Sequence, residues 1–413
     1  RRDMSISPFR PIIIFCLLCA AYIMVSFQRL CMGIIAPDIA ASLAIGSVAL
    51  GWLGSGFHYS YALFQIPGGY IIDRYGPRIP LVFFFGLAGG LGSLLFASAS
   101  DFSMSLTARL LTGACMSIVT ASSFKTISML FSGGHYMRFV SIFMATGGLG
   151  MLLSATPLAL LNAACGWQNI LYTVGLLGLA LGAAFHFLLK GMAPSSVRKQ
   201  QPGNFAFTNL VKELFATKGF LVVLLWYVST SSIFFSFASL WAGPYYMTVF
   251  GLSPERTGSL LSVGILGLII GTPGGAWLSE RLGARKPVLR LSSLLAVAGS
   301  LMLCLPGDGS FMFIAGLSFV LVCLSGNVGA SVIYALLKDA VPAHLVGLST
   351  AVMSSSLFVL TAILQMAIGY LLDIFPSSTG SMPYDKAFLC YLFLAVTSLL
   401  LSFRLRDTVT AEN

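Results

Sequence analysis

The sequence predicts an all-α integral membrane protein with twelve transmembrane helices in two pseudo-symmetric six-helix halves. Hydrophobic residues make up 57% of the 413 residues and charged residues only 9%, whereas soluble domains carry about 25% charged residues. The apolar stretches are long enough for membrane-crossing helices, rather than short and alternating as in β-barrel strands. A related turn motif occurs at 67–78 and again at 273–286, and this repeat predicts two similar halves.

Twelve stretches are long and apolar enough to cross a hydrocarbon core of about 30 Å, which takes roughly 20 residues of helix. We predict transmembrane helices over 11–37, 48–71, 79–99, 104–131, 137–162, 167–190, 219–247, 257–279, 287–305, 311–337, 347–374 and 386–404. The first six belong to an N-terminal half (1–190) and the last six to a C-terminal half (219–413). The longest polar stretch (191–218) lies between them and is predicted to be a cytosolic linker.

The loops between the predicted helices carry most of the Lys and Arg residues on one side of the membrane. That side holds both termini and the 2–3, 4–5, 6–7 and 8–9 loops, whereas the opposite side has only Arg256 and Lys386. Because basic loops stay in the cytosol, we expect both termini to be cytosolic. The short loops fit a plasma membrane of the bacterial inner-membrane type. The net charge of +10 reflects this orientation and does not indicate a nucleic-acid partner.

The sequence shows no catalytic or metal-binding pattern. Its eight Cys are scattered through apolar stretches without CxxC or Cys/His spacing. GxSxG, HExxH and a phosphate-cradling Gly-Lys-Ser/Thr loop are missing. We therefore predict a protein that is not an enzyme, holds no cofactor or metal, and works as a monomer in contact with membrane lipid. Without an ATPase loop, any transport must be driven by gradients or by exchange.

The turn motif of the N-terminal half places glycines and three charges at the end of a predicted helix. The glycines allow close helix packing and a sharp turn, and the charges can form a network that holds one face of the protein closed. Any short cytosolic loop carries Arg, but the spacing and its imperfect repeat favour a gate. The predicted gating residues are Gly69, Asp73, Arg74, Gly76 and Arg78, with Glu280 and Arg281 in the second copy.

Residues 69–78 (GYIIDRYGPR) resemble the loop 2–3 signature of the major facilitator superfamily. Residues 61–69 (YALFQIPGG), Arg29, residues 109–113 (RLLTG) and residues 166–167 (GW) resemble its anion:cation symporter branch. The resemblance implies transport of small organic anions such as sugar acids, or of inorganic anions such as phosphate, often together with protons. The branch often has a Glu in the fourth helix where this chain has Met116, which puts proton coupling through that acid in question.

Three basic residues fall inside the predicted helices, where a charge costs at least about 2.5–3.5 kcal/mol and marks a functional candidate. Arg29 lies well inside the first helix, and its planar guanidinium can bind a carboxylate or phosphate with two bonds. We predict Arg29 to be the main anion ligand, with snorkelling to the outer surface as the alternative. Arg109 fits an outer gate or a snorkelled side chain as well as substrate contact. Lys125 fits an inner vestibule as well as a snorkelled side chain.

No Asp or Glu falls near the middle of a predicted helix, so the three buried cations lack an evident carboxylate partner. An anionic substrate would supply the missing counter-charge, whereas a cationic drug would require a buried acid. His58 shares one helix face with Tyr61 and Gln65 through its i, i+3, i+7 spacing. It could carry a proton, hydrogen-bond the substrate, or be a neutral histidine satisfied between helices.

Polar side chains of the second half add candidate contacts to a cavity wall. The seventh helix mixes aromatic rings with hydroxyls, and the tenth and eleventh carry amide and hydroxyl groups. The predicted substrate-binding residues of this half are Tyr227, Ser231, Asn327 and Ser355. Helix packing alone would also explain each of them.

The sequence thus predicts a secondary transporter that moves a small organic anion by alternating access, through proton-coupled symport or anion exchange. A proton route would use His58 instead of an acid. One alternative is a transporter of the same fold for a neutral or zwitterionic solute, such as an amino acid or nucleoside, or an efflux pump for lipophilic compounds. Another is a receptor or scaffold that transports nothing, which would have no need for unpaired cations in the membrane.

Overall fold

A computed structural model of the chain describes residues 9–191, 207–305, 312–375 and 383–405, which form helices joined by loops. In chain order the helices are α1 (Arg10–Leu30), α2 (Met32–Leu43), α3 (Ser47–Tyr75), the π-helical η1 (Pro80–Gly89), α4 (Gly90–Ala97), α5 (Phe102–Met116), α6 (Val119–Leu130), α7 (Gly134–Leu153), α8 (Thr156–Leu188), α9 (Phe207–Ala216), α10 (Phe220–Ser236), the π-helical η2 (Phe237–Trp241), α11 (Ala242–Val249), α12 (Pro254–Leu282), α13 (Lys286–Leu303), α14 (Met312–Val328), α15 (Ala330–Ala340), the 3₁₀ turn η4 (Ala343–Leu345), α16 (Val346–Ile374), α17 (Tyr384–Ala387) and α18 (Leu389–Arg404).

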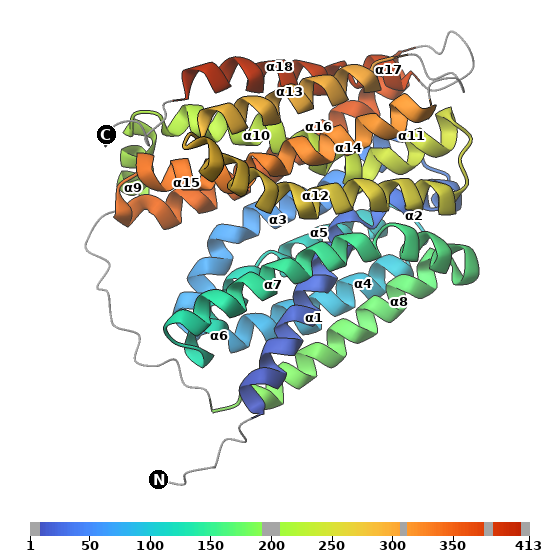
Figure 1. Cartoon of the computed structure of the whole chain (residues 1–413). Helices are drawn as coiled ribbons and strands as arrows, with labels where there is room; N and C mark the ends of the chain where they lie inside the picture. The colour runs from blue at the N-terminus through green and yellow to red at the C-terminus, as the bar shows by residue number, and fades with distance from the viewer. Residues whose placement is uncertain (1–8, 192–206, 306–311, 376–382, 406–413) are drawn as a thin grey trace, which may run out of the picture.

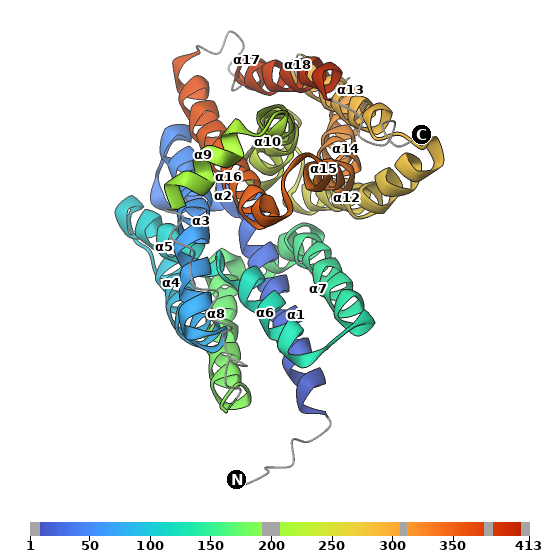
Figure 2. The ribbon, with the colours of Figure 1, turned by 90° about the vertical axis from the view of Figure 1, so that its left-hand side faces the viewer.

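The helices gather into two groups that follow the order of the chain. In Figure 1, α1 to α8 lie in the lower part of the molecule and α10 to α18 in the upper part. The view along the bundle in Figure 2 shows the same two groups, one above the other. Helix α9 falls within the range predicted as a linker, while 192–206 lie outside the described residues. The boundaries of the two predicted halves stay a prediction.

Eleven helices within the described residues are long and apolar enough to cross a membrane. The second predicted crossing, α3, is not among them, although it spans 29 residues. Its length is sufficient, but Gly, Ser, Tyr and His dilute its apolar content. A polar crossing helix must turn these groups toward other helices, because lipid offers them no hydrogen bonds. The prediction of an all-helical membrane protein is confirmed.

Several of the expected helices are interrupted. The first crossing breaks at Cys31, where α1 gives way to α2. The residues expected for the fifth and sixth crossings form α7 and α8, with a break at Ala155 and with Pro157 in the first turn of α8. Proline favours the first turn of a helix because its missing N–H has no partner there in any case. Gly166, with φ of 77°, kinks α8 between the two predicted ranges.

The two groups of helices touch through bare backbone where α2 meets η2 and α11. A Cβ atom added to Gly33 would overlap the carbonyl oxygen of Ala238, and one added to Gly243 would overlap the carbonyl oxygen of Gly33. Nearby, the hydroxyls of Thr156 on α8 and Ser262 on α12 lie 2.7 Å apart. We call this end of the bundle the α2 end; it lies on the right in Figure 1, where α11 lies beside α2.

Helices α3 and α16 also join the two groups, over much of their length. A Cβ atom added to Gly51 would lie 2.9 Å from the carbonyl oxygen of Gln365, so the two backbones are close there. Further along α3, the Gln65 amide donates to the Ser354 hydroxyl at 3.1 Å and accepts from the Ser355 hydroxyl at 2.8 Å. This packing brings the polar face of α3 against α16.

We expect Gly243→Ala to destabilise the protein, because the new methyl group would collide with the backbone of α2. Overpacking of this kind costs about 1–3 kcal/mol. The matched control is Gly274→Ala in α12, where an added Cβ meets nothing within 4 Å and helix propensity gains up to about 1 kcal/mol. Thermal unfolding in detergent should show a lower midpoint for Gly243→Ala alone. Equal midpoints would show that the α2 end is not closed by backbone contact.

Candidate substrate site

The side chain of Arg29 lies in the interior, near the end of α1, and is only 6% exposed. Its guanidinium donates a hydrogen bond of 2.9 Å to the hydroxyl of Tyr61 on α3. Three aromatic faces surround the guanidinium carbon: Tyr61 and Phe358 at 4.9 Å and Phe235 at 6.0 Å from their ring centres. Because Phe235 belongs to α10 and Phe358 to α16, the charge is held by both groups of helices.

Phe358 connects Arg29 to His58. The ring centres of Phe358 and His58 lie 5.9 Å apart, and the two rings are nearly parallel, at 25°. The ring centres of Phe358 and Tyr61 lie 4.8 Å apart. The Nδ1 atom of His58 lies 3.2 Å from the carbonyl oxygen of Gly54. A carbonyl only accepts, so Nδ1 carries the proton and Nε2 offers a lone pair in the neutral ring. We call Arg29, His58, Tyr61, Phe235 and Phe358 the Arg29 cluster.

Several buried polar atoms around the Arg29 cluster have no hydrogen-bond partner among the described residues. They include Nε of Arg29, Nε2 of His58 and Oε1 of Gln365. Gln365 sits on α16, where its amide nitrogen donates to the hydroxyl of Ser239 at 2.7 Å. Leaving a buried donor or acceptor unsatisfied costs about 1–3 kcal/mol. The guanidinium of Arg29 is the donor, and Nε2 of His58 and Oε1 of Gln365 are acceptors. A polar ligand in this region could form hydrogen bonds with all of them.

The other predicted binding residues lie on the neighbouring helices with bonds of their own. Gln65 and Ser355 bond to each other, as described above. Tyr227 accepts a bond of 3.0 Å from the Tyr334 hydroxyl. The Ser231 hydroxyl approaches the carbonyl of Gly326 at 3.5 Å, and the Asn327 amide donates to the carbonyl of Cys323 at 2.9 Å. Of the predicted set, the structure therefore brings Arg29 into direct contact with Tyr61 and Gln65 into contact with Ser355, while His58 joins the cluster through the ring of Phe358.

Arg109 is a buried clamp between helices. Its side chain is 1% exposed, and its Nε and Nη1 donate to the carbonyls of Leu53 and Gln28 at 3.3 and 3.4 Å. The guanidinium carbon lies 4.7 Å from the ring centre of Phe57 and 5.7 Å from that of Phe96. This side chain is not snorkelled to a surface. Its donors are turned to the backbone of α1 and α3, which favours a role in packing.

Lys125 on α6 pairs with the turn motif. Its ammonium group lies 3.0 Å from a carboxylate oxygen of Asp73 and 3.0 Å from the carbonyl oxygen of Ile72. Asp73 is 83% exposed, so the pair is near the surface, where such pairs contribute at most about 1 kcal/mol. Lys125 thus contacts the predicted gate and is separate from the Arg29 cluster.

The structure fixes the register between the two copies of the turn motif. A Cβ atom added to Gly68 would overlap the side chain of Ile118, and one added to Gly275 would overlap the carbonyl of Val328. Five residues after these glycines stand Asp73 and Glu280. Eight residues after them stand the left-handed Gly76 (φ 74°) and Gly283 (φ 59°), which end α3 and α12. Gly69, predicted for the gate, meets nothing within 4 Å, so close packing falls to Gly68.

The charges of the two motifs make separate local contacts. Arg74 donates to the hydroxyl of Tyr70 at 2.9 Å, and Arg78 donates to the carbonyl of His186 at 3.1 Å. In the second copy, Arg281 lies 5.3 Å from the ring centre of Trp277, and Arg285 pairs with Asp339 of α15. Each motif thus forms an ion pair within its own group of helices. In the first copy the acidic Asp73 pairs with Lys125, and in the second the basic Arg285 pairs with Asp339. Glu280 stands in the second copy where the first has Asp73.

Phe358 was not among the predicted site residues. It is 5% exposed and contacts four members of the site. A single buried phenylalanine in a transmembrane helix gives no specific signal, because lipid-facing and core positions also favour phenylalanine. The polar neighbours Ser354 and Ser355 on the same helix were the indication that α16 lines the interior.

We expect Arg109→Ala to act on stability more than on substrate affinity. The change removes two charge-assisted hydrogen bonds and leaves a cavity, which together should lower the free energy of unfolding by about 2–4 kcal/mol. The KM of the folded fraction should stay within about twofold. The measurements are thermal unfolding and concentration-dependent uptake, with exposed Arg256→Ala as the control. A normal unfolding midpoint together with a tenfold higher KM would assign Arg109 to the substrate.

Several transporters are similar to this chain. The "Probable galactarate/D-glucarate transporter GarP" of Escherichia coli (strain K12) is 22% identical over 414 residues, covering 89% of this chain and 90% of that protein. The "Probable sulfoacetate transporter SauU" of Cupriavidus necator is 22% identical, covering 90% and 88%. The "Hexuronate transporter" of Bacillus subtilis (strain 168) is 25% identical, covering 68% and 67%.

Solved structures share the fold at low sequence identity. A bacterial homologue of the human lysosomal transporter Spinster, in an inward-facing and occupied conformation, matches with a TM-score of 0.76 and 14% identity over 97% of each chain. The nucleoside transporter NupG matches with a TM-score of 0.68 and 12% identity, covering 94% of this chain and 99% of that one. The Major Facilitator Superfamily profile matches residues 18–364. The chain is therefore an integral membrane transporter of the Major Facilitator Superfamily, and not an enzyme.

Proposed function

We propose that this transporter carries a small organic anion by alternating access and that Arg29 is its main anion ligand. The observation that supports this most is the buried guanidinium of Arg29, whose Nε has no partner. Among the described residues, the ion pairs lie elsewhere and no carboxylate pairs with Arg29. A buried cation without a counter-ion is costly, and a carboxylate ligand would supply both the charge and the missing acceptor.

The named cargoes of the relatives agree with this chemistry. Galactarate, glucarate, sulfoacetate and hexuronate are all organic anions, and most also carry hydroxyl groups. A carboxylate at Arg29 would leave such hydroxyls near Nε2 of His58 and Oε1 of Gln365, which both accept. As the two halves of the protein move, the cavity around the ligand would be shaped by Tyr227, Ser231, Asn327, Gln65 and Ser355. Their bonds to other residues must then exchange for bonds to the ligand.

Alternating access requires contacts at each end that can open. We propose that the bare backbone contact at the α2 end forms one gate. The other gate lies at the turn motifs, with Gly69, Asp73, Arg74, Gly76 and Arg78 in one half and Glu280 and Arg281 in the other. The ion pair of each motif lies within its own group of helices. Surface pairs contribute at most about 1 kcal/mol, so they could exchange at low cost for contacts between the two motifs when this gate closes. The two halves would be 1–190 and 219–413, joined by a linker at 191–218.

The orientation follows from the same charges. Basic loops are retained on the cytosolic side, so the turn motifs and both termini would face the cytosol of a plasma membrane, of the bacterial inner-membrane type. The gate at the α2 end would then face outward.

Two coupling mechanisms fit the Arg29 cluster. Binding an anion neutralises Arg29, whereas the empty site carries its charge as the protein reorients, which favours exchange of one anion for another. In a proton-coupled symport, His58 would take the proton on Nε2, the atom that is left without a partner. Proton binding at His58 would then accompany the anion and leave on the other side.

Replacing Arg29 tests the proposal directly. We expect Arg29→Ala to reduce uptake of galactarate, glucarate or hexuronate into proteoliposomes by roughly 10- to 150-fold, since a hydrogen-bonded charge contributes about 1.5–3 kcal/mol. Exposed Arg138→Ala serves as the matched control, and thermal unfolding checks that both variants are folded. Normal transport by Arg29→Ala, or a wild-type protein that moves no anion of the panel, would overturn the proposal.

Replacing His58 separates the two coupling mechanisms. If the histidine carries the proton, His58→Gln should abolish anion accumulation driven by an inward proton gradient while retaining exchange against anion loaded inside the vesicle. Both are measured on the same proteoliposomes, with and without internal anion. Full pH-driven accumulation by His58→Gln would exclude the histidine as the proton carrier.

A further inference from the structure

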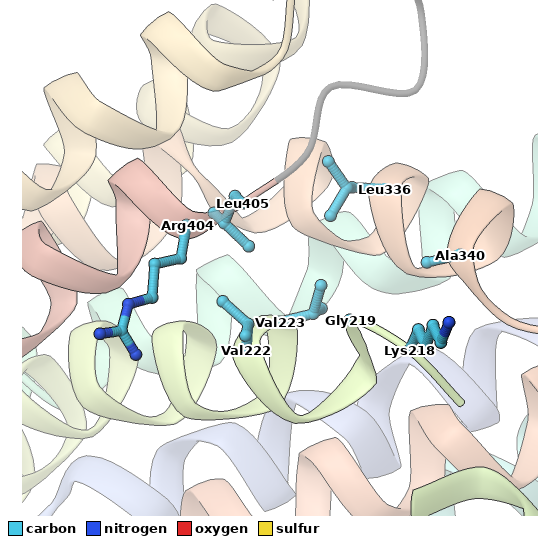
Figure 3. Close-up of a pocket in the computed structure, with 8 residues that line it drawn as sticks. All are labelled: Lys218, Gly219, Val222, Val223, Leu336, Ala340, Arg404 and Leu405. Carbon is cyan, nitrogen blue, oxygen red and sulfur yellow. The ribbon is translucent and has the colours of Figure 1, made fainter. Parts of the chain in front are cut away.

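A pocket lies where α10 begins and α18 ends, at the far end of α10 from Phe235 of the Arg29 cluster. It has a volume of about 430 Å³ and lies among α10, α15 and α18 (Figure 3). Its lining residues are Lys218, Gly219, Val222, Val223, Leu336, Ala340, Arg404 and Leu405. The proposed transport mechanism does not use this pocket.

The walls of the pocket are apolar. Val223 is 2% exposed, Leu336 3% and Leu405 3%, and Val222 and Ala340 complete the apolar surface. The pocket therefore offers an acyl chain or another hydrocarbon group a surface on which burial is favourable. An inorganic anion would gain nothing from these walls.

Two basic residues stand at the rim. Lys218 lies two residues before the first residue of α10, and Arg404 is the last residue of α18. Figure 3 shows the two side chains on opposite sides of the pocket, with the apolar residues between them. Both side chains are exposed, and within the described residues neither forms a hydrogen bond or an ion pair. The rim is thus positively charged and has no counter-ion among the residues that the structure describes.

The pocket opens where the apolar surface of the bundle meets the helix ends. On α10 the neighbouring Leu221 is 49% exposed, and on α18 Phe403 is 56% exposed. Exposed side chains of this kind on membrane-crossing helices face acyl chains. The cations of the rim lie at the ends of the same helices, at the level of the lipid headgroups. Under the proposed orientation these helix ends face the cytosol. Basic pockets between transmembrane helices on the cytosolic side are a known form of anionic lipid site.

We propose that this pocket binds an anionic phospholipid. Its phosphate lies between Lys218 and Arg404, and one acyl chain lies against Val222, Val223 and Leu336. The complementarity is twofold: the two cations match the net negative headgroup, and the apolar wall matches the chain. A zwitterionic lipid brings its own cation to the rim and lacks the first match. By bridging α10 and α18, the lipid ties together two helices of the second group.

The experiment uses the purified full chain in nanodiscs of phosphatidylcholine that contain a minority of phosphatidylglycerol. Native mass spectrometry after release counts the retained lipids of each kind. We expect preferential retention of phosphatidylglycerol by the wild type. In Lys218→Gln/Arg404→Gln, retention should fall by roughly tenfold or more, because each cation near the headgroups adds about 1 kcal/mol. The control Arg138→Gln/Lys190→Gln removes two exposed cations outside the pocket and should retain the wild-type preference.

A second variant separates the pocket from its charge. Val222→Phe keeps both cations but fills the apolar space, and it should also lose phosphatidylglycerol. Thermal unfolding with either lipid confirms that all variants are folded. Phosphatidylglycerol should raise the unfolding midpoint of the wild type but not those of the variants with an altered pocket.

The proposal fails if phosphatidylcholine is retained equally well, if the control pair loses as much lipid as the pocket pair, or if Val222→Phe behaves like the wild type. Displacement of the lipid by inorganic phosphate would assign the rim to a free anion and would also overturn it. Gain of lipid in a variant ending at Leu405 would show that the chain's own tail occupies the pocket, with the same consequence.

Discussion

The charge of Arg29, held in the interior without a carboxylate partner, is the constraint on which the rest of the site depends. Cation–π contacts recover about 0.5–2 kcal/mol each when desolvated, and a charge in the membrane costs at least about 2.5–3.5 kcal/mol. Tyr61, Phe235 and Phe358 therefore offset much of the cost of the charge, yet they cannot supply an opposite charge. The rings can thus hold the charge without a ligand, and under the proposed function the arrangement would gain further from an anion.

This constraint also explains why the site is shared between the two groups of helices. Arg29 and Tyr61 come from α1 and α3, and the rings of Phe235 and Phe358 come from α10 and α16. An anion that takes over the guanidinium changes the contacts of both groups at once. The backbone contact between Gly243 and Gly33, which lies four residues along the chain from Arg29, holds the groups together at the α2 end. Under the proposed function, binding and gating would thus be linked through rigid helices, as alternating access requires.

Much of the fold could be predicted because it depends on few and simple rules. Long apolar stretches and low charge predicted a helical membrane protein, and Arg29 stood out because a charge is costly there. The α3 helix was predicted from the length and apolar content of 48–71, although Gly, Ser, Tyr and His dilute that content. The role of Arg109 and the contacts of Phe358 could not be predicted, since both depend on which neighbours the helices bring together. The same holds for Gly68: only the packing against Ile118 distinguishes it from Gly69.

The turn motifs show how a structure sharpens a sequence repeat. Aligned by their Pro-Gly-Gly letters, the copies disagree by one residue at the acid. Aligned by the glycines that contact another helix, Gly68 and Gly275, the acids and the left-handed glycines coincide. Steric fit between helices, and not the letters, is what the two copies share.

The most direct test of the account compares two ligands that share a carbon skeleton, one with a carboxylate and one without. Isothermal titration of the purified protein with a sugar acid and with the corresponding uncharged alditol reports on Arg29 without any substitution. The account predicts that the acid binds and the alditol binds at least about tenfold more weakly, since the loss of one charged hydrogen-bonding group costs about 1.5–3 kcal/mol. Equal binding of the two ligands, or binding of the alditol alone, would contradict it.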